Sequence, residues 1–165
     1  DMTFMIALGI GAATTIRVSH QLGSGDLPAL RMASNASIHL VLVMNTIGAS
    51  LMIVLRNYIP MLFTEDKEVI AIAAQLIVLA GLFQYADGLQ AVGAAMLRGI
   101  TDVKVPMVIA FVSYILIGLS VGLLCAFPLK LGAAGIWIGF IVALAIAAIC
   151  FHIRFNRKLK AFTKG

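Results

Sequence analysis

Five long apolar runs fill most of this 165-residue chain and limit what it can fold into. They cover approximately residues 2–18, 36–55, 69–96, 106–127 and 133–153. A bilayer core about 30 Å thick takes roughly 20 apolar residues per helix, with a range of about 17–25. Each run reaches that length, so we predict an all-α membrane protein with a bundle of five transmembrane helices.

The composition supports lipid as the solvent of these helices. Hydrophobic residues make up 62% of the chain and charged residues 12%, whereas soluble domains are nearer half and a quarter. A net charge of +5 on a soluble protein would suggest nucleic acid as a partner. Here the basic residues stand between and after the apolar runs, so we interpret them as orientation signals and expect the lipid bilayer, not nucleic acid, as the partner.

Polar and turn-forming residues mark the connections between the runs. Residues 21–35 hold turn residues and become helical again around Ala29. Thr64 is followed by acidic residues and is predicted to cap the third helix. Pro106 suits the first turn of the fourth helix, and residues 128–132 form a tight turn. These signals predict short loops between antiparallel neighbours.

Basic residues are distributed unequally between the two ends of the predicted bundle. One end receives nine of them: Arg17, Arg31, Arg98, Lys104, Arg154, Arg157, Lys158, Lys160 and Lys164. The other end receives only three: Arg56, Lys67 and Lys130. Cytoplasmic loops carry the excess of Lys and Arg, so we predict a cytoplasmic C-terminus. The basic tail, residues 154–165, serves as an orientation anchor in this interpretation; binding of anionic lipid or of a partner is the alternative.

Asp87 lies in the middle of the third run, within the segment Gln84-Tyr85-Ala86-Asp87-Gly88-Leu89-Gln90. An aspartate is too short to reach the headgroups from there, and a carboxylate at the bilayer centre costs about 2.5–3.5 kcal/mol on insertion scales. Gln84 and Gln90 recur at three-residue spacing and share one face of the helix with Asp87, and Gln75 points roughly the same way. Because lipid does not satisfy polar groups, this face is expected to turn toward other helices or water.

Two interpretations of this polar face are open. In the first, amides and a protonated Asp87 exchange hydrogen bonds across the bundle and only hold the helices together. In the second, Asp87 binds a cation or a proton on an ion pathway. An ionisable group in mid-span favours the second interpretation, and neutral glutamines by themselves would favour the first.

Other residues indicate packing, not chemistry. No His or carboxylate set has metal-ligand spacing, and neither a Ser–His arrangement nor a phosphate-binding loop is present, so we do not expect an enzyme. Cys125 and Cys150 fall inside apolar runs and are expected to be buried thiols. Glycines four residues apart, Gly118 with Gly122 and Gly135 with Gly139, predict close helix–helix contacts.

Three segments resemble the multidrug and toxic compound extrusion (MATE) family, and most closely its bacterial NorM-like branch. Residues 17–25, Arg-Val-Ser-His-Gln-Leu-Gly-Ser-Gly, are similar to a motif at the end of the family's eighth helix. Residues 84–90, followed by Leu-Arg-Gly-Ile-Thr-Asp at 97–102, are similar to its tenth helix and the next loop. Residues 132–139 resemble the start of the twelfth helix. The three segments occur in the family's order along nearly the whole chain.

The resemblance implies that residues 1–165 belong to the C-terminal lobe of a twelve-helix, two-lobed antiporter in the bacterial inner membrane. It implies that inward Na⁺ or H⁺ movement drives efflux of organic, often cationic, drugs, with no further cofactor. Asp87 would contribute to the cation site, and Gln84, Tyr85 and Gln90 would shape the site or the substrate cavity.

The same resemblance implies that a partner acid on the seventh helix and the whole N-terminal lobe lie outside this sequence. We therefore expect the chain to be part of a longer protein and not to transport alone. A flippase for lipid-linked oligosaccharides from the same superfamily is the nearest alternative, and we expect it to need basic residues in mid-span. A membrane scaffold without transport activity is the alternative from another class.

Overall fold

The computed structural model describes residues 2–164, with side chains from Met5 to Lys164. The described residues form helices joined by short connections, and no strand occurs among them. In chain order the elements are α1 (Met2–Gly23), α2 (Leu27–Val54), α3 (Tyr58–Met61), α4 (Lys67–Gly99), α5 (Lys104–Phe111), the π-helical segment η1 (Val112–Gly118), α6 (Leu119–Ala126) and α7 (Ala133–Thr163). The prediction of an all-α fold is confirmed.

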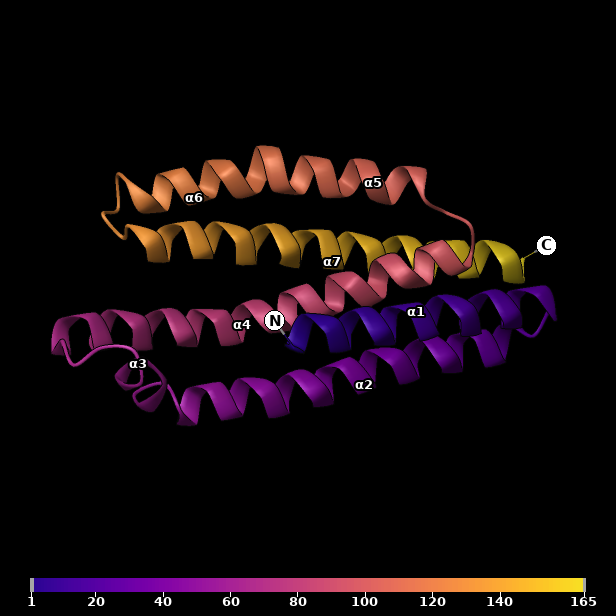
Figure 1. Cartoon of the computed structure of the whole chain (residues 1–165). Coiled ribbons are helices and arrows are strands. Elements are labelled where there is room, and N and C mark those ends of the chain that lie inside the picture. Colours follow the sequence, from indigo (N-terminus) through magenta and orange to yellow (C-terminus); the bar gives the residue numbers. More distant parts are fainter. Residues whose placement is uncertain (1, 165) are drawn as a thin grey trace.

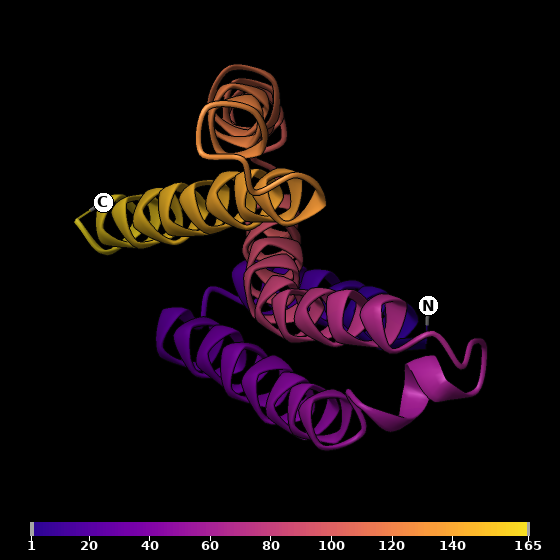
Figure 2. The ribbon, with the colours of Figure 1, turned by 90° about the vertical axis from the view of Figure 1, so that its left-hand side faces the viewer.

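Helix α4 joins the two halves of the bundle. Figures 1 and 2 show α1 and α2 side by side in one half, and α7 beside the α5–η1–α6 rod in the other. α4 runs obliquely between the halves and packs against α1, α2 and α7. The turn after α1, the α4–α5 connection and the C-terminus lie at one end of the bundle, and α3 and the α6–α7 turn lie at the other (Figure 1).

Four helical stretches in the described part of the chain are long and apolar enough to cross a membrane. They are Leu27–Val54, Lys67–Gly99, Lys104–Ala126 and Ala133–Thr163. They correspond to the second to fifth predicted spans. The first predicted span falls on α1, which is helical but is not among these four, so its crossing of the bilayer stays a prediction.

Side-chain caps set where two of the helices begin. Asp26 caps α2 by accepting a hydrogen bond from the Ala29 amide at 3.0 Å, so the helix begins nine residues before the apolar run. The N-cap of α4 is Asp66, which accepts from the Glu68 amide at 2.9 Å. The prediction of Thr64 as this cap is wrong, because Thr64 lies two residues too early to reach the first turn and accepts from the Asp66 amide instead, at 3.2 Å.

The C-terminal residues predicted as a basic tail continue α7 as helix up to Thr163. Phe155 and Leu159 from this part are buried and join Phe151 in the hydrophobic core. Arg154 donates from Nε to Asp102 Oδ2 in the α4–α5 connection. Because these residues pack against α4 and its loop, the basic segment is a part of the bundle.

The glycine pairs bring α7 close to the fourth span, as predicted. A Cβ atom added to Gly139 would lie 2.6 Å from the Gly118 carbonyl oxygen and from Gly122 Cα, and one added to Gly135 would lie 2.5 Å from the Ala126 amide nitrogen. These are backbone atoms, which cannot move aside as a flexible side chain does. The backbones of α6, η1 and α7 therefore touch through positions that only glycine fits.

We expect Gly139→Ala to destabilise the fold by about 1–3 kcal/mol, because its methyl group overpacks against the backbone of α6 and η1. Gly9→Ala is the matched control: it also adds one methyl group to a helical glycine, but with no atom within 4 Å. Thermal unfolding of the purified protein in detergent measures both changes. Equal stability of the two variants would contradict the close packing described above.

Candidate functional site

Asp87 occupies the middle of α4, far from the charged residues at the ends of that helix. Lys67 and Glu68 stand at its start and Arg98 in its last turn. The Asp87 side chain is half-buried, and no described residue donates a hydrogen bond to its carboxylate or forms an ion pair with it. A carboxylate at this depth in a membrane helix is the kind of group that binds a cation or a proton on an ion pathway.

Aromatic side chains from three helical segments lie in the part of the bundle that holds Asp87. Phe83, one turn before Asp87 on α4, packs edge-to-face on Trp137 of α7, with ring centroids 5.3 Å apart and planes at 86°. Tyr114 of η1 is near enough to interact with the Asp87 charge. Aromatic faces attract cations, so a carboxylate beside such rings suits an organic cation.

Sequence reasoning missed Phe83, Trp137 and Tyr114 as site residues. The position of Phe83, four residues before Asp87, was a signal that the sequence does contain, because residues at this spacing are neighbours on a helix. Trp137 and Tyr114 come from other segments, and only the packing of α7 on α4 and of η1 on α7 brings them to this part of the bundle.

Gln84 and Tyr85 make their side-chain contacts with α2. Asn45 Nδ2 donates to the Gln84 backbone carbonyl at 2.8 Å, and the Gln84 side chain donates from Nε2 to Met52 Sδ at 2.8 Å. Tyr85 donates from its hydroxyl to Thr46 Oγ1 at 2.9 Å. These contacts hold α2 and α4 together, as expected if polar side chains of this segment serve helix packing.

Gln90 follows Asp87 by three residues and is half-buried, so both occupy the same side of α4. Its amide makes no hydrogen bond with a described residue. Gln84 precedes Asp87 by the same spacing, and its side-chain nitrogen serves the α2 contact, so one end of the predicted polar face takes part in packing. Tyr85 is two residues from Asp87, a spacing that places side chains on opposite sides of a helix.

A cleft of about 600 Å³ lies between the first halves of α4 and α7. Its lining includes Gln75, Leu79 and Ile138, with Arg56 and Asn57 at the end of the bundle that holds α3. Leu79 lies one turn before Phe83, and Ile138 follows Trp137 in the sequence, so the cleft lies on the α3 side of the aromatic pair, which does not line it. Its volume is within the range of small-molecule sites, about 300–1,000 Å³.

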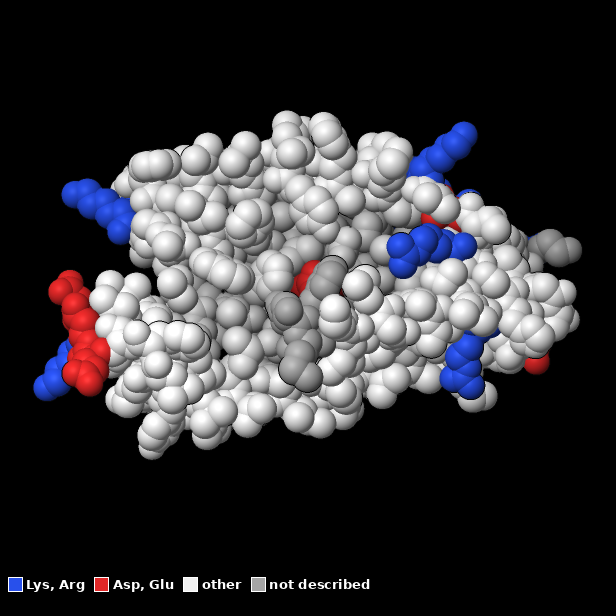
Figure 3. Space-filling model, viewed as in Figure 1, with Lys and Arg blue, Asp and Glu red and all other residues white. Residues whose placement is uncertain are grey.

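Charge gathers at the two ends of the bundle. Figure 3 shows Lys and Arg at both ends, acidic side chains at the end that holds α3, and a middle that is almost uncharged except for one acidic surface. This distribution agrees with a single mid-span carboxylate on α4. Among residues 2–164, no group of three or more His, Cys, Asp or Glu is arranged to hold a metal ion.

Comparison with known proteins defines the class of the bundle. The MatE family model matches residues 1–124. The probable multidrug resistance protein NorM of Rhizobium meliloti (strain 1021) is 38% identical over 165 residues, which cover 97% of this chain and 35% of that protein. Multidrug resistance protein PmpM of Pseudomonas aeruginosa is 40% identical, over 99% of this chain and 35% of that protein. The chain thus spans about a third of the length of these relatives.

Solved structures share the fold. A MATE structure in the straight conformation matches with a TM-score of 0.86 at 18% identity, over 99% of this chain and 37% of that one. The eukaryotic MATE transporter AtDTX14 matches with a TM-score of 0.83 at 23% identity, over 98% and 37%. The bundle is thus a portion of a membrane transporter fold. The chain belongs to the MATE family.

The contact between Tyr85 and Thr46 can be tested by a double-mutant cycle. We expect Tyr85→Phe and Thr46→Val each to lower the free energy of unfolding, and the double variant to lose less than the sum, with a coupling of about 0.6 kcal/mol, the average for such membrane hydrogen bonds. Equilibrium unfolding in mixed micelles measures the cycle. Tyr58→Phe, at an exposed tyrosine in α3, should be additive with Thr46→Val. Additivity in the Tyr85 cycle would show that the hydrogen bond contributes nothing.

Proposed function

We propose that the chain is the C-terminal lobe portion of a cation-coupled multidrug exporter in a bacterial inner membrane. The observation that carries the proposal is the mid-span Asp87 carboxylate, which no described residue pairs. The multidrug resistance names of the relatives, which are 36–40% identical, support the substrate class. The N-terminal lobe would supply the remaining helices, the opposite cavity wall and a second acid.

Asp87 is the group that binds the coupling ion, Na⁺ or H⁺. Hard cations take oxygen ligands, and the carboxylate of Asp87, the amide oxygen of Gln90 and the hydroxyl of Tyr114 are oxygen donors in this region. With a proton as the coupling ion, Asp87 suffices by itself. In either case, neutralising the carboxylate removes the cost of a charge in the membrane. The bound ion therefore favours one conformation of the transporter over another.

The exported compound is an organic cation or amphipathic drug that enters by the cleft between α4 and α7. The Phe83–Trp137 pair offers aromatic faces to its positive charge, and Asp87 offers the countercharge. Ion and drug would therefore compete for one carboxylate, which is a simple physical basis for antiport. Alternating access fits the fold, because solved relatives are described in inward-facing and outward-facing conformations.

Two alternatives make different demands on the site. A flippase for lipid-linked oligosaccharides carries anionic phosphates and favours basic residues in the cavity, but the described mid-span charge is the acidic Asp87. A scaffold requires Asp87 only as a packing group, and then its carboxylate would be expected to bond a neighbouring helix. Asp87 without such a partner favours the exporter.

The end of the bundle that holds the C-terminus is proposed to be cytoplasmic. The nine-to-three distribution of basic residues supports this orientation. A reporter that is active only in the cytoplasm, fused after Lys164, should give signal. A reporter that is active only outside the cytoplasm should give signal when inserted at Glu65. The reverse pattern would overturn the orientation.

Asp87→Asn in the full-length protein should lower the rate of ion-driven efflux of a fluorescent organic cation at least tenfold. The amount of the variant protein in the membrane should stay normal. Asparagine keeps the size and hydrogen bonding of the side chain but cannot carry the negative charge or take up the proton. Efflux from everted vesicles, driven separately by a Na⁺ gradient and by a pH gradient, measures the change and identifies the ion.

Three variants serve as controls for this experiment. Glu65→Gln removes an exposed carboxylate outside the spans and should leave efflux unchanged. Gln84→Ala should lower stability more than efflux, because Gln84 bonds Met52 of α2. Gln90→Ala should do less than Asp87→Asn, because the charge remains. Near-normal efflux by Asp87→Asn under both gradients would reduce Asp87 to a packing residue.

A further inference from the structure

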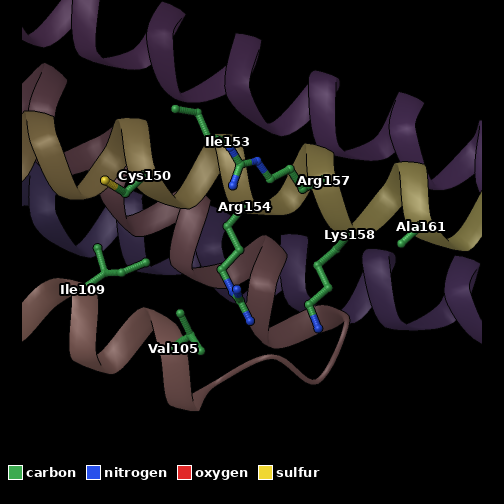
Figure 4. A pocket seen from close by; sticks show the side chains of 8 residues that line it. All are labelled: Val105, Ile109, Cys150, Ile153, Arg154, Arg157, Lys158 and Ala161. Atoms are coloured by element: carbon green, nitrogen blue, oxygen red, sulfur yellow. The ribbon is translucent and has the colours of Figure 1, made fainter.

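A groove separate from the α4–α7 cleft lies between α5 and the second half of α7 (Figure 4). Its volume is about 510 Å³. α5 contributes Val105 and Ile109, one helical turn apart, and α7 contributes residues at three- and four-residue spacing along one face: Cys150, Ile153, Arg154, Arg157, Lys158 and Ala161. The groove lies at the end of the bundle where most basic residues gather.

The groove has an apolar part and a cationic part, which follow one another along α7. Up to Ile153 the α7 side of the groove is apolar, and from Arg154 onward it is cationic. Figure 4 shows Arg154 and Lys158 extending from α7 toward the α4–α5 connection, and the Arg157 side chain lying back toward Ile153. Cationic groups therefore border an apolar floor, as the headgroup boundary borders the hydrocarbon core of a bilayer.

Asp102 fixes one of these cations in place. Arg154 donates from Nε to Asp102 Oδ2, and the side chains of the pair are only 29% and 9% exposed. An arginine has five N–H donors, so the terminal nitrogens of Arg154 can still donate to a phosphate. No carboxylate in the described part of the chain pairs with Arg157 or Lys158, which leaves the groove with net positive charge.

We propose that this groove binds an anionic phospholipid. The lipid phosphate accepts hydrogen bonds from Arg154, Arg157 and Lys158, and an acyl chain lies on Ile109, Cys150 and Ile153. Basic pockets between transmembrane helices are known to hold anionic headgroups. The apolar half of the groove favours a lipid over a free phosphate ion, which would leave that half in contact with water. The binding does not depend on Asp87 or on transport.

Native mass spectrometry of the delipidated full-length protein tests the proposal, with phosphatidylglycerol as the probe and phosphatidylcholine of the same acyl chains as its neutral counterpart. We expect one tight phosphatidylglycerol site. Arg157→Gln combined with Lys158→Gln should weaken that site roughly tenfold or more, since each basic residue near a membrane surface strengthens anionic lipid binding several-fold. Binding of phosphatidylcholine should change less than about twofold, because it carries no net charge to lose.

Matched variants separate this groove from general electrostatics. Lys160→Gln combined with Lys164→Gln removes the same charge from the same end of α7 but outside the groove, and should change phosphatidylglycerol binding less than about twofold. Ile109→Trp keeps the cations, fills the apolar floor and should also weaken the site. Glycerol 3-phosphate, which lacks acyl chains, should not displace the lipid. An equal loss in the two charge variants, unchanged binding in Ile109→Trp, or displacement by glycerol 3-phosphate would each overturn the proposal.

Discussion

Close contact between the backbone of α4 at its glycines and the side chains of neighbouring helices is the constraint on which the rest of this bundle depends. A Cβ atom on Gly88 would overlap Asn45 and Val41 of α2, one on Gly99 would lie 2.7 Å from Val18 of α1, and one on Gly93 would lie 3.0 Å from Phe151 of α7. Helices in lipid gain no hydrophobic energy by associating, so they rely on contact of this kind. A single helix can thereby pack against three neighbours and connect the two halves.

The same helix separates its polar groups by function. Toward α2, the Gln84 backbone carbonyl, the Gln84 side-chain nitrogen and the Tyr85 hydroxyl make interhelical hydrogen bonds, whereas the buried Gln84 Oε1 has no partner among the described residues. Asp87 and Gln90 have no hydrogen-bond partner among the described residues. In a bilayer a polar group that lacks a protein partner is costly, so it persists where function requires it. The mid-span carboxylate of Asp87 is therefore the strongest structural argument for an ion or substrate site.

The basic end of the bundle is as organised as its centre. The ion pair of Arg154 with Asp102 ties the α4–α5 connection to α7, and Phe155 and Leu159 anchor the same stretch in the core. Arg157 and Lys158 are then presented beside an apolar groove in a fixed arrangement. A segment that orients the protein in the membrane can thus also form a specific lipid contact, because both depend on the same positive charge.

The sequence by itself determined the helical class, the long apolar helices and the glycine contacts between α7 and the fourth span, and it singled out Asp87, whose role stays a prediction. Each of these depends on composition or on residue spacing within one segment, and both can be read directly from the sequence. The cap of α4 was misplaced by two residues, because several neighbouring polar side chains suit such a position and only the backbone decides among them. The helical end of α7 was also not expected, because its buried Phe155 and Leu159 are hidden among basic residues.

Only the tertiary structure decided which polar residues face which neighbour. Gln84 and Gln90 look equivalent by their spacing from Asp87, and only the contact of Gln84 with α2 distinguishes them. Tyr114, Trp137 and Asp102 gain their roles from segments that are distant in sequence, and no local pattern predicts such contacts. The reason is physical: spacing along one helix fixes the direction of a side chain relative to its own axis, whereas the partner in that direction is set by how whole helices pack.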